Sequence, residues 1–346
     1  MKTANPYRLL LTVAVFLAAA GCRSDRSEEG TPRETASTAQ PEGARASPTS
    51  GQSIQRTPIA TIEVGDGPDA LWHDVARQAL YVANVEDTLV SVIATSTETS
   101  WNVVSTISVP GGPWGFAQLD ADRLLVSSWE RALTVINLNT RAVVRTIPLD
   151  FNAGGLAVDS PGGLAYVVAP EESRVVAISL DTGRPIRSFS TDTGPDGIAL
   201  TRDGRHLIVA ASSAGIIDVI AIDSGEVVKR HQVGDKPELV HRGHGARVYV
   251  SNFFGDRVHV IDGSSGEHLR DISGIDGPED PVESPDGQSL FVASFETDQL
   301  LMFDVASGAP RGPPFATGDR PIGVVATNTH LFVSNYGDDT VSVFAR

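Results

Sequence analysis

Cysteine is almost absent from this chain of 346 residues, because Cys22 is the only one. A single thiol excludes an internal disulfide, a zinc site built on several cysteines, a c-type haem attachment and a catalytic thiol pair. Charged residues make up only 20% of the chain, whereas glycine (33) and proline (21) are frequent. This composition is typical of a loop-rich, all-β protein.

Basic residues are also scarce, with 27 Lys and Arg against 43 Asp and Glu and a formal charge of −16. Residues 57–346 alone hold 20 basic and 38 acidic side chains. A surface this acidic repels nucleic-acid phosphates and anionic lipids. We therefore expect no nucleic-acid partner and no direct binding of the protein body to a membrane.

The sequence has one notable apolar run, Leu9 to Ala20, which follows the basic residues Lys2 and Arg8. Twelve residues are too few to span a bilayer as a helix and fit the apolar region of a secretory signal. The following Ala-Ala-Gly-Cys (19–22) resembles the lipobox of bacterial lipoproteins, although Ala19 stands where leucine is usual. The alternative is ordinary signal cleavage with a spare thiol.

The lipobox resemblance implies that residues 1–21 are a lipoprotein signal peptide and that Cys22 carries the lipid. Arg23 follows the cysteine in place of aspartate, which implies the outer membrane. We therefore predict a lipid-anchored protein of the bacterial cell envelope that faces the periplasm. Residues 22–56 lack aromatic residues and contain one large aliphatic residue, Ile54, so we predict a disordered tether there.

The remainder, residues 57–346, consists of repeats. Seven boxes of two apolar residues, a small residue and a small or polar one begin 41 to 44 residues apart, at residues 81, 125, 166, 208, 249, 291 and 332. Each box is followed by two further β-type runs. Four short strands in a repeat of this length indicate one blade of a β-propeller. The sequence therefore predicts a seven-bladed, all-β propeller.

The two ends of the repeat region complement each other. The last repeat stops at Arg346 after its third strand, while Ile59–Pro68 matches the fourth strand of the first repeat, Val104–Pro113. An N-terminal strand would thus complete the last blade and close the ring, which removes the exposed sheet edge. A closed ring has no free edge to drive association, so we expect a monomer.

Several of the boxes resemble the YVTN-type β-propeller repeat family. The resemblance is carried by Tyr81-Val-Ala-Asn84, Tyr249-Val-Ser-Asn252, Ser284-Pro-Asp-Gly287 and Thr340-Val-Ser-Val343. It implies the propeller fold but no single activity, because the family includes lactone hydrolases, surface-layer proteins, nucleic-acid binders and subunits of redox enzymes.

Blade topology predicts which residues meet at one mouth of the central channel. In the loops that lead into six of the blades, the residues directly after proline are Asp69, Trp114, Asp196, Glu238, Glu279 and Ile322, and Asp280 lies beside Glu279. Blade three has Gly154 and Gly155 there instead, so four of the seven blades place a carboxylate near this mouth. The loops after the boxes add the aromatic residues Trp129, Phe254, Phe295 and Tyr336.

An apolar rim around carboxylates suits a partner or a small cationic ligand. A divalent cation on oxygen ligands and a sugar stacked on tryptophan are alternatives. A further alternative is that the aromatic rings wedge between blades while the acids stay solvated. We predict that the five acidic and five aromatic residues named above form a ligand-binding face.

Catalytic motifs are missing: the sequence has no Gly-x-Ser-x-Gly elbow, phosphate loop or His-Glu-x-x-His. All four tryptophans lie in the first two repeats, which argues against a quinone-cofactor propeller. We predict a non-catalytic protein that binds an envelope protein or a small molecule, without a resident cofactor. The alternative is a metal-assisted hydrolase or lactonase that uses the same face, with Glu279 and Arg320 as candidate groups.

Histidines offer a weaker hypothesis. His73 and His241 each lie eight residues before their boxes, and His244 is close to His241. These imidazoles could hold a metal ion, but blades one and five are not adjacent and no third ligand is obvious, so polar packing between blades and a histidine in a turn is the favoured explanation.

Overall fold

The computed structural model describes residues 56–96 and 101–346. The predicted signal peptide, Cys22 and the predicted tether up to residue 55 lie outside the described residues, so these assignments stay predictions.

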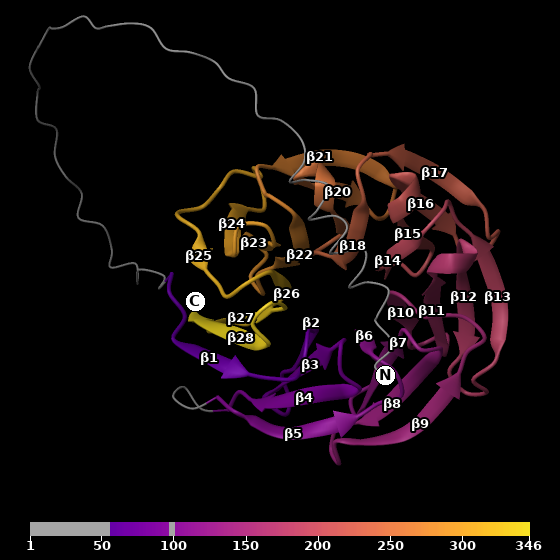
Figure 1. The fold of residues 1–346 in the computed structure, drawn as a ribbon. Coiled ribbons are helices and arrows are strands. Elements are labelled where there is room, and N and C mark those ends of the chain that lie inside the picture. The colour runs from indigo at the N-terminus through magenta and orange to yellow at the C-terminus, as the bar shows by residue number, and fades with distance from the viewer. Residues whose placement is uncertain (1–55, 97–100) are drawn as a thin grey trace, which may run out of the picture. The chain divides into compact units, whose positions relative to one another are not determined.

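The described residues form seven antiparallel four-stranded sheets, which follow one another around a ring (Figure 1). Blade one contains β2 (Pro68–Asp74), β3 (Ala79–Asn84), β4 (Leu89–Ala94) and β5 (Val103–Ser108). Blade two contains β6 (Pro113–Gln118), β7 (Arg123–Ser128), β8 (Ala132–Asn137) and β9 (Ala142–Pro148). Blade three contains β10 (Leu156–Asp159), β11 (Leu164–Ala169), β12 (Arg174–Ser179) and β13 (Pro185–Ser190).

The remaining blades repeat this order. Blade four contains β14 (Pro195–Leu200), β15 (His206–Ala211), β16 (Ile216–Ala221) and β17 (Val227–Gln232). Blade five contains β18 (Pro237–Arg242), β19 (Arg247–Asn252), β20 (Arg257–Asp262) and β21 (Glu267–Ser273). Blade six contains β22 (Pro278–Glu283), β23 (Ser289–Ser294), β24 (Gln299–Asp304) and β25 (Phe315–Ala316). Blade seven combines β26 (Pro321–Ala326), β27 (His330–Asn335), β28 (Thr340–Ala345) and β1 (Ala60–Glu63).

Helical structure in the described residues is limited to three single turns, η1 (Pro170–Glu172), η2 (Ser212–Ala214) and η3 (Phe253–Gly255). Within residues 56–96 and 101–346, no helix has the length and apolar character needed to cross a bilayer. The prediction of a seven-bladed, all-β propeller is confirmed.

The core lies between blades. The seven boxes form the second strand of each blade, and all six residues of β3 are buried. Each of the seven apolar clusters joins two neighbouring blades; one cluster, for example, combines Leu125 and Leu133 of blade two with Val167 and Val176 of blade three. Strands packed on both faces need side chains that are apolar on both, which explains the continuous apolar runs in the sequence.

Blade seven closes the ring as predicted. The first described strand, β1, pairs with the last, β28, from Ala60 opposite Val343 to Glu63 opposite Thr340 (Figure 1). Ile62 is buried by this pairing and packs against Val341 and Val343.

Blade six has the shortest outer strand, because β25 covers only Phe315 and Ala316. The preceding residues include Pro310, Pro313 and Pro314, which cannot donate to a sheet ladder. Arg56, the last residue of the predicted tether, supports this edge: its carbonyl accepts from the Ala316 N–H at 3.2 Å, and its guanidinium lies 4.1 Å from the centre of the Phe315 ring.

Candidate functional site

The predicted acidic residues sit in β-bulges at the starts of the innermost strands. In six of the seven blades the strand begins with proline, and the pairing register shifts directly after it. A bulge takes residues out of the regular alternation and redirects their side chains. Here it frees the residues after each proline to face the central channel.

The innermost strands of all seven blades enclose a cavity of about 130 Å³ in this channel. Asp69, Trp114 and Asp280 line it at the end where the innermost strands begin, which we call the channel mouth. Leu156, Ile198 and Val240 line its wall.

Glycine lets neighbouring blades approach closely at the channel mouth. A Cβ atom on Gly197 would lie 2.1 Å from the carbonyl oxygen of Glu238 in the next blade. A Cβ atom on Gly323 of blade seven would lie 2.3 Å from the carbonyl oxygen of Asp69 in blade one. This backbone contact brings acidic residues from different blades near one another.

Five predicted carboxyl groups meet at the channel mouth, and we call them the acidic cluster: Asp69, Asp196, Glu238, Glu279 and Asp280. They come from blades one, four, five and six. Asp196 and Glu279 are each 8% exposed and Asp280 is 7% exposed.

Burial raises the pKa of every member of the acidic cluster, and repulsion from other members adds to this at Asp69, Asp196 and Glu279. Burial, then repulsion from Asp196, raises the pKa of Asp69 to about 8. Burial, then repulsion from Glu238, raises the pKa of Asp196 to about 7. Burial also raises the pKa values of Glu238, Glu279 and Asp280. The cluster therefore carries protons near neutral pH that a bound cation would displace.

Two basic side chains contact the acidic cluster. Lys236 Nζ lies 2.6 Å from Glu238 Oε1 and also lies over the rings of Phe253 (4.6 Å) and Phe254 (5.3 Å). Burial lowers the pKa of Lys236, but the ion pair with Glu238 outweighs burial and leaves it above its usual value. His241 Nδ1 lies 3.1 Å from Asp280 Oδ1.

Our sequence reasoning missed Lys236, although the sequence contains a signal. The residue before the strand-starting proline is Gly67 in blade one, Gly194 in blade four and Gly277 in blade six, all with positive φ. Blade five has Lys236 in that place, also with positive φ.

The predicted aromatic residues divide into two groups. Trp114 lines the cavity, and its ring lies 6.2 Å from that of Trp129; Phe254 is 47% exposed beside Lys236. In contrast, Phe295 is 4% exposed and packs edge-on against Phe253. Tyr336 donates its hydroxyl hydrogen bond to Glu86 and so links blade seven to blade one. The ligand-binding role of these residues stays a prediction.

Comparison with known proteins identifies the family. The family model of the outer membrane protein assembly factor BamB matches residues 85–311, which is most of the chain. The chain belongs to this family. The match supports a β-propeller repeat family, whereas the finer resemblance to YVTN-type repeats stays a prediction. No curated protein matches the sequence.

Solved structures support the fold of this BamB-family chain. Hydrazine synthase from Kuenenia stuttgartiensis aligns with a TM-score of 0.68 and 18% identity, over 81% of this chain and 96% of that chain. A chain of a mitotic checkpoint complex aligns with a TM-score of 0.72 and 11% identity, over 90% and 99% of the two chains. At such identities the likeness shows the fold alone.

The histidines singled out in the sequence have separate polar partners in the BamB-family propeller. His73 Nε2 lies 3.0 Å from Thr95 Oγ1. His241 contacts Asp280, whereas His244 Nδ1 lies 2.6 Å from Glu283 Oε2. These contacts are of the kind expected if the three histidines pack as polar side chains, which was the alternative to metal binding.

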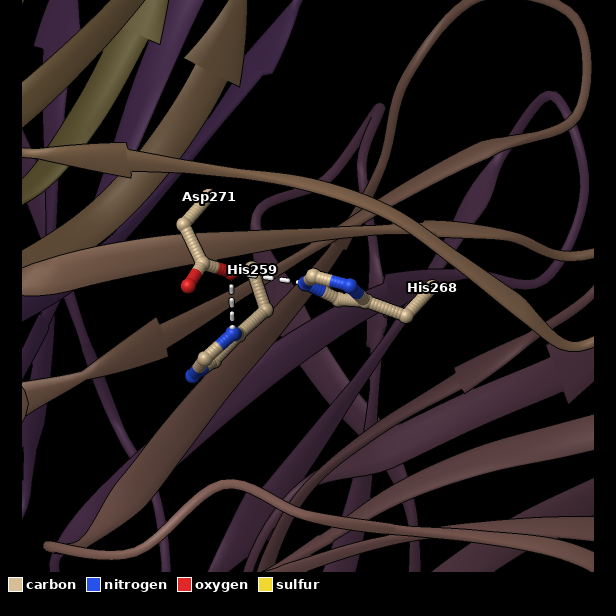
Figure 2. A group of neighbouring side chains, drawn as sticks. All are labelled: His259, His268 and Asp271. Carbon is tan, nitrogen blue, oxygen red and sulfur yellow. Dashed lines mark hydrogen bonds and ion pairs between the residues drawn. The ribbon is translucent and has the colours of Figure 1, made fainter.

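Three other side chains of the kinds that bind metal ions lie together at the outer edge of blade five, and the sequence analysis did not single them out. His259 of β20 and His268 and Asp271 of β21 come together (Figure 2). His259 Nδ1 and His268 Nε2 each lie 2.7 Å from Asp271 Oδ1. A bulge opposite Val260 and Ile261 allows His268 and Asp271, three residues apart, to face the same side.

Hydrogen bonding assigns this group a structural role. The Asn252 amide donates to the Gly234 carbonyl (2.8 Å) and accepts from the Gly255 N–H (3.2 Å), which fixes its orientation. Its Nδ2 then faces His259 Nε2 at 3.2 Å, so a neutral His259 carries its proton on Nδ1 and donates it to Asp271. A metal ion at Nδ1 would have to displace that proton and disrupt this network.

The repeat contains a sequence signal for the cluster of His259, His268 and Asp271, because His259 replaces a serine of other blades. In blades one and seven the box asparagine donates to a serine, from Asn84 to Ser91 and from Asn335 to Ser342. His259 occupies the same place in blade five.

Proposed function

We propose that this protein is a non-catalytic, lipid-anchored propeller of the bacterial envelope that binds a partner protein at the acidic channel mouth. The observation that carries the proposal is the convergence of five carboxyl groups, from four blades, at the channel mouth, where Lys236 pairs with Glu238 at 2.6 Å. Membership of the family of an outer membrane protein assembly factor supports an envelope location and a binding or scaffold role.

The size of the cavity favours a protein partner over a whole small-molecule ligand. Pockets for drug-sized molecules enclose roughly 300–1,000 Å³. The cavity of about 130 Å³ is smaller and suits one inserted side chain. Asp69 and Asp280 of the acidic cluster line this cavity and favour a basic side chain, and Trp114 supplies apolar contact.

The test replaces the acids and follows the proteins captured from a solubilised envelope extract. The variant Asp69→Asn, Asp196→Asn, Glu238→Gln, Glu279→Gln should lose a partner that the wild type retains, as identified by mass spectrometry. The matched control replaces four exposed acids away from the channel mouth: Glu63→Gln, Asp150→Asn, Asp181→Asn and Glu226→Gln. Identical capture by all three proteins would refute the proposal.

A metal-assisted hydrolase or lactonase at the same face is the second candidate. The raised pKa values of Asp69 and Asp196 favour it, since general acids and bases work best with a pKa near the operating pH. A screen of lactone substrates with added divalent cations separates the two functions. We expect no turnover; turnover that Glu279→Gln abolishes would establish the enzyme.

A further inference from the structure

Lys236 adopts a backbone conformation that costs free energy for any residue except glycine. Its φ is 66°, and the three equivalent glycines have φ values of 62°, 64° and 57°. A left-handed backbone conformation is unfavourable for a residue that carries a Cβ atom, because that atom comes too close to the following carbonyl oxygen. Such strain persists where the surroundings hold it in place, and it often marks a functional site.

The surroundings of Lys236 form a binding site for an alkylammonium ion. Its Nζ pairs with Glu238 and lies over two phenylalanine rings. Asp196 and Glu279 lie within electrostatic range of the same ammonium group. Carboxylates combined with aromatic faces favour an organic cation, because the rings attract its charge and pack against its methylenes.

The acidic cluster can accept more positive charge than Lys236 provides. Asp196 and Glu279 are more than nine-tenths buried, and in the described part of the chain neither side chain has a hydrogen bond or an ion pair. Glu238 Oε2 is likewise buried and lacks a hydrogen bond within the described residues. Unpaired buried carboxyl groups of this kind are destabilising until a cation joins them.

We propose that Lys236 is a tethered stand-in for the ligand, and that the channel mouth binds an alkylammonium group which displaces it. This inference rests on the proposed function and specifies the chemistry of that site. The incoming group pairs with Glu238 between the acidic cluster and the rings of Phe253 and Phe254, while Lys236 turns out to solvent. The group is the side chain of a lysine on the partner protein.

A free amine would present the same ammonium chemistry, so the experiment uses both sources. One probe is a short peptide that is uncharged apart from a single central lysine, and its control carries norleucine in that place. The second probe is 1,5-diaminopentane. A third, Ca²⁺ alone, tests for a metal ion in place of an ammonium group. Binding is measured by calorimetry on the full chain.

Lys236→Gly is the decisive variant, because it restores the glycine of the other blades and removes the competing ammonium. A tethered group competes at an effective concentration in the millimolar range, so its loss should tighten lysine-peptide binding by about tenfold or more. Lys236→Met, which keeps much of the side-chain volume, should act in the same direction.

Arg141→Gly is the matched control. Arg141 also has a positive φ, of 53°, but it lies in the turn between β8 and β9, at the end of blade two opposite the channel mouth. The substitution removes the same charge and the same backbone strain, and it should change the affinity by less than about twofold if long-range electrostatics are screened.

The outcomes separate the two proposals. Tighter binding in Lys236→Gly alone supports displacement, and loss of binding with norleucine identifies the lysine side chain as the ligand. Binding of the diamine without the peptide would make the ligand a free amine and overturn the assignment to a partner lysine. Unchanged or weaker binding in Lys236→Gly, binding of Ca²⁺ alone, or no binding of either amine would overturn displacement.

The four-acid variant reports on the proposed function itself. If it loses binding while Lys236→Gly behaves as the wild type, the site remains and only the role of Lys236 fails. If it binds every probe and partner as the wild type does, the proposed function fails as well.

Discussion

At the scale of single residues, Asp69 is the clearest case of a side chain whose ionisation opposes folding. Its pKa in the folded protein is about 8, above the ordinary value of 3.8. A carboxyl group whose pKa is raised by folding stabilises the protein fully at a pH below its ordinary pKa. That stabilisation is lost as the pH rises to the pKa of the folded state. The wild type should therefore lose stability from this group between about pH 4 and pH 8.

Asp69→Asn should remove that loss. We compare the free energy of unfolding of the variant with that of the wild type at two pH values. The variant's advantage should be about 1–2 kcal/mol greater at pH 8.5 than at pH 5, after allowance for solvent screening. Urea titrations at both pH values test this. Asp150→Asn, which removes an exposed charge, is the control. A margin that does not grow with pH would contradict the raised pKa.

Glu283 is the opposite case, because its ionised form is stabilised. Its side chain is 3% exposed and accepts hydrogen bonds from Arg247 Nε (2.6 Å) and Tyr249 Oη (2.6 Å). Burial raises its pKa, but these bonds and those from His244 outweigh burial and hold the pKa at about 2.

Glu283→Gln should lower the free energy of unfolding at pH 7 by about 2–3 kcal/mol, and Tyr249→Phe by about 1 kcal/mol. A lowered pKa contributes stability above the ordinary value of 4.5 that is lost as the pH falls through about 2. The difference between wild type and Glu283→Gln should therefore shrink from pH 7 to pH 3. Urea titrations measure it; a constant difference would exclude the ionised network.

At the scale of the element, the pairing of β1 with β28 holds the ring closed. Ile62 points into the core between blades seven and one, whereas its neighbour Thr61 is exposed. Ile62→Ala should cost about 2–4 kcal/mol, as expected for a large buried aliphatic residue. Thr61→Ala should cost less than about 1 kcal/mol. Thermal unfolding of the two variants gives the comparison, and equal effects would mean that β1 is not part of the core.

The bulges of the innermost strands yield a second prediction at this scale. Gly197 and Gly115 occupy the same place in blades four and two, but only Gly197 faces a backbone oxygen at 2.1 Å. A Cβ at Gly115 would meet the Leu156 side chain at 3.2 Å, which can move. Gly197→Ala should destabilise the protein by about 1–3 kcal/mol, more than Gly115→Ala. Denaturant titration decides; a larger effect at Gly115 would contradict this packing.

The sequence predicted elements and blades well because the repeat records them many times. Box spacing predicts the second strand of each blade, and the matching segments at the two ends predict closure. Proline predicts the acidic cluster, since it fixes where each innermost strand begins. The repeat therefore predicts the location of any residue that occupies an equivalent position in each blade.

Residues that depart from the repeat were harder to place. The burial of Phe295 depends on its contact with Phe253 of the neighbouring blade. The contact between His259 and Asp271 depends on the β-bulge that shifts the pairing register of β20 and β21. The role of Lys236 depends on a left-handed backbone and on carboxylates more than 40 positions away, such as Glu279. None of these contacts is encoded by local spacing.

At the scale of the whole molecule, the ring brings together side chains that are distant in sequence. Asp69 and Glu279 are separated by most of the described chain, yet burial and then repulsion from groups that include Asp69 raise the pKa of Glu279. A rigid ring keeps these like charges together, because separating them would require the blades to part. This arrangement makes the channel mouth ready for a cation before any ligand arrives.

The most direct test of this account is the pKa of Asp69 in the folded protein, measured by carboxyl ¹³C NMR in wild type and Asp196→Asn. Repulsion from Asp196 is the largest contribution to the shift after burial. We predict a wild-type pKa of about 8 that falls in Asp196→Asn and is unchanged in the Asp150→Asn control. An Asp69 pKa near 4, or one that Asp196→Asn leaves unchanged, would contradict the convergence of these blades on one acidic site.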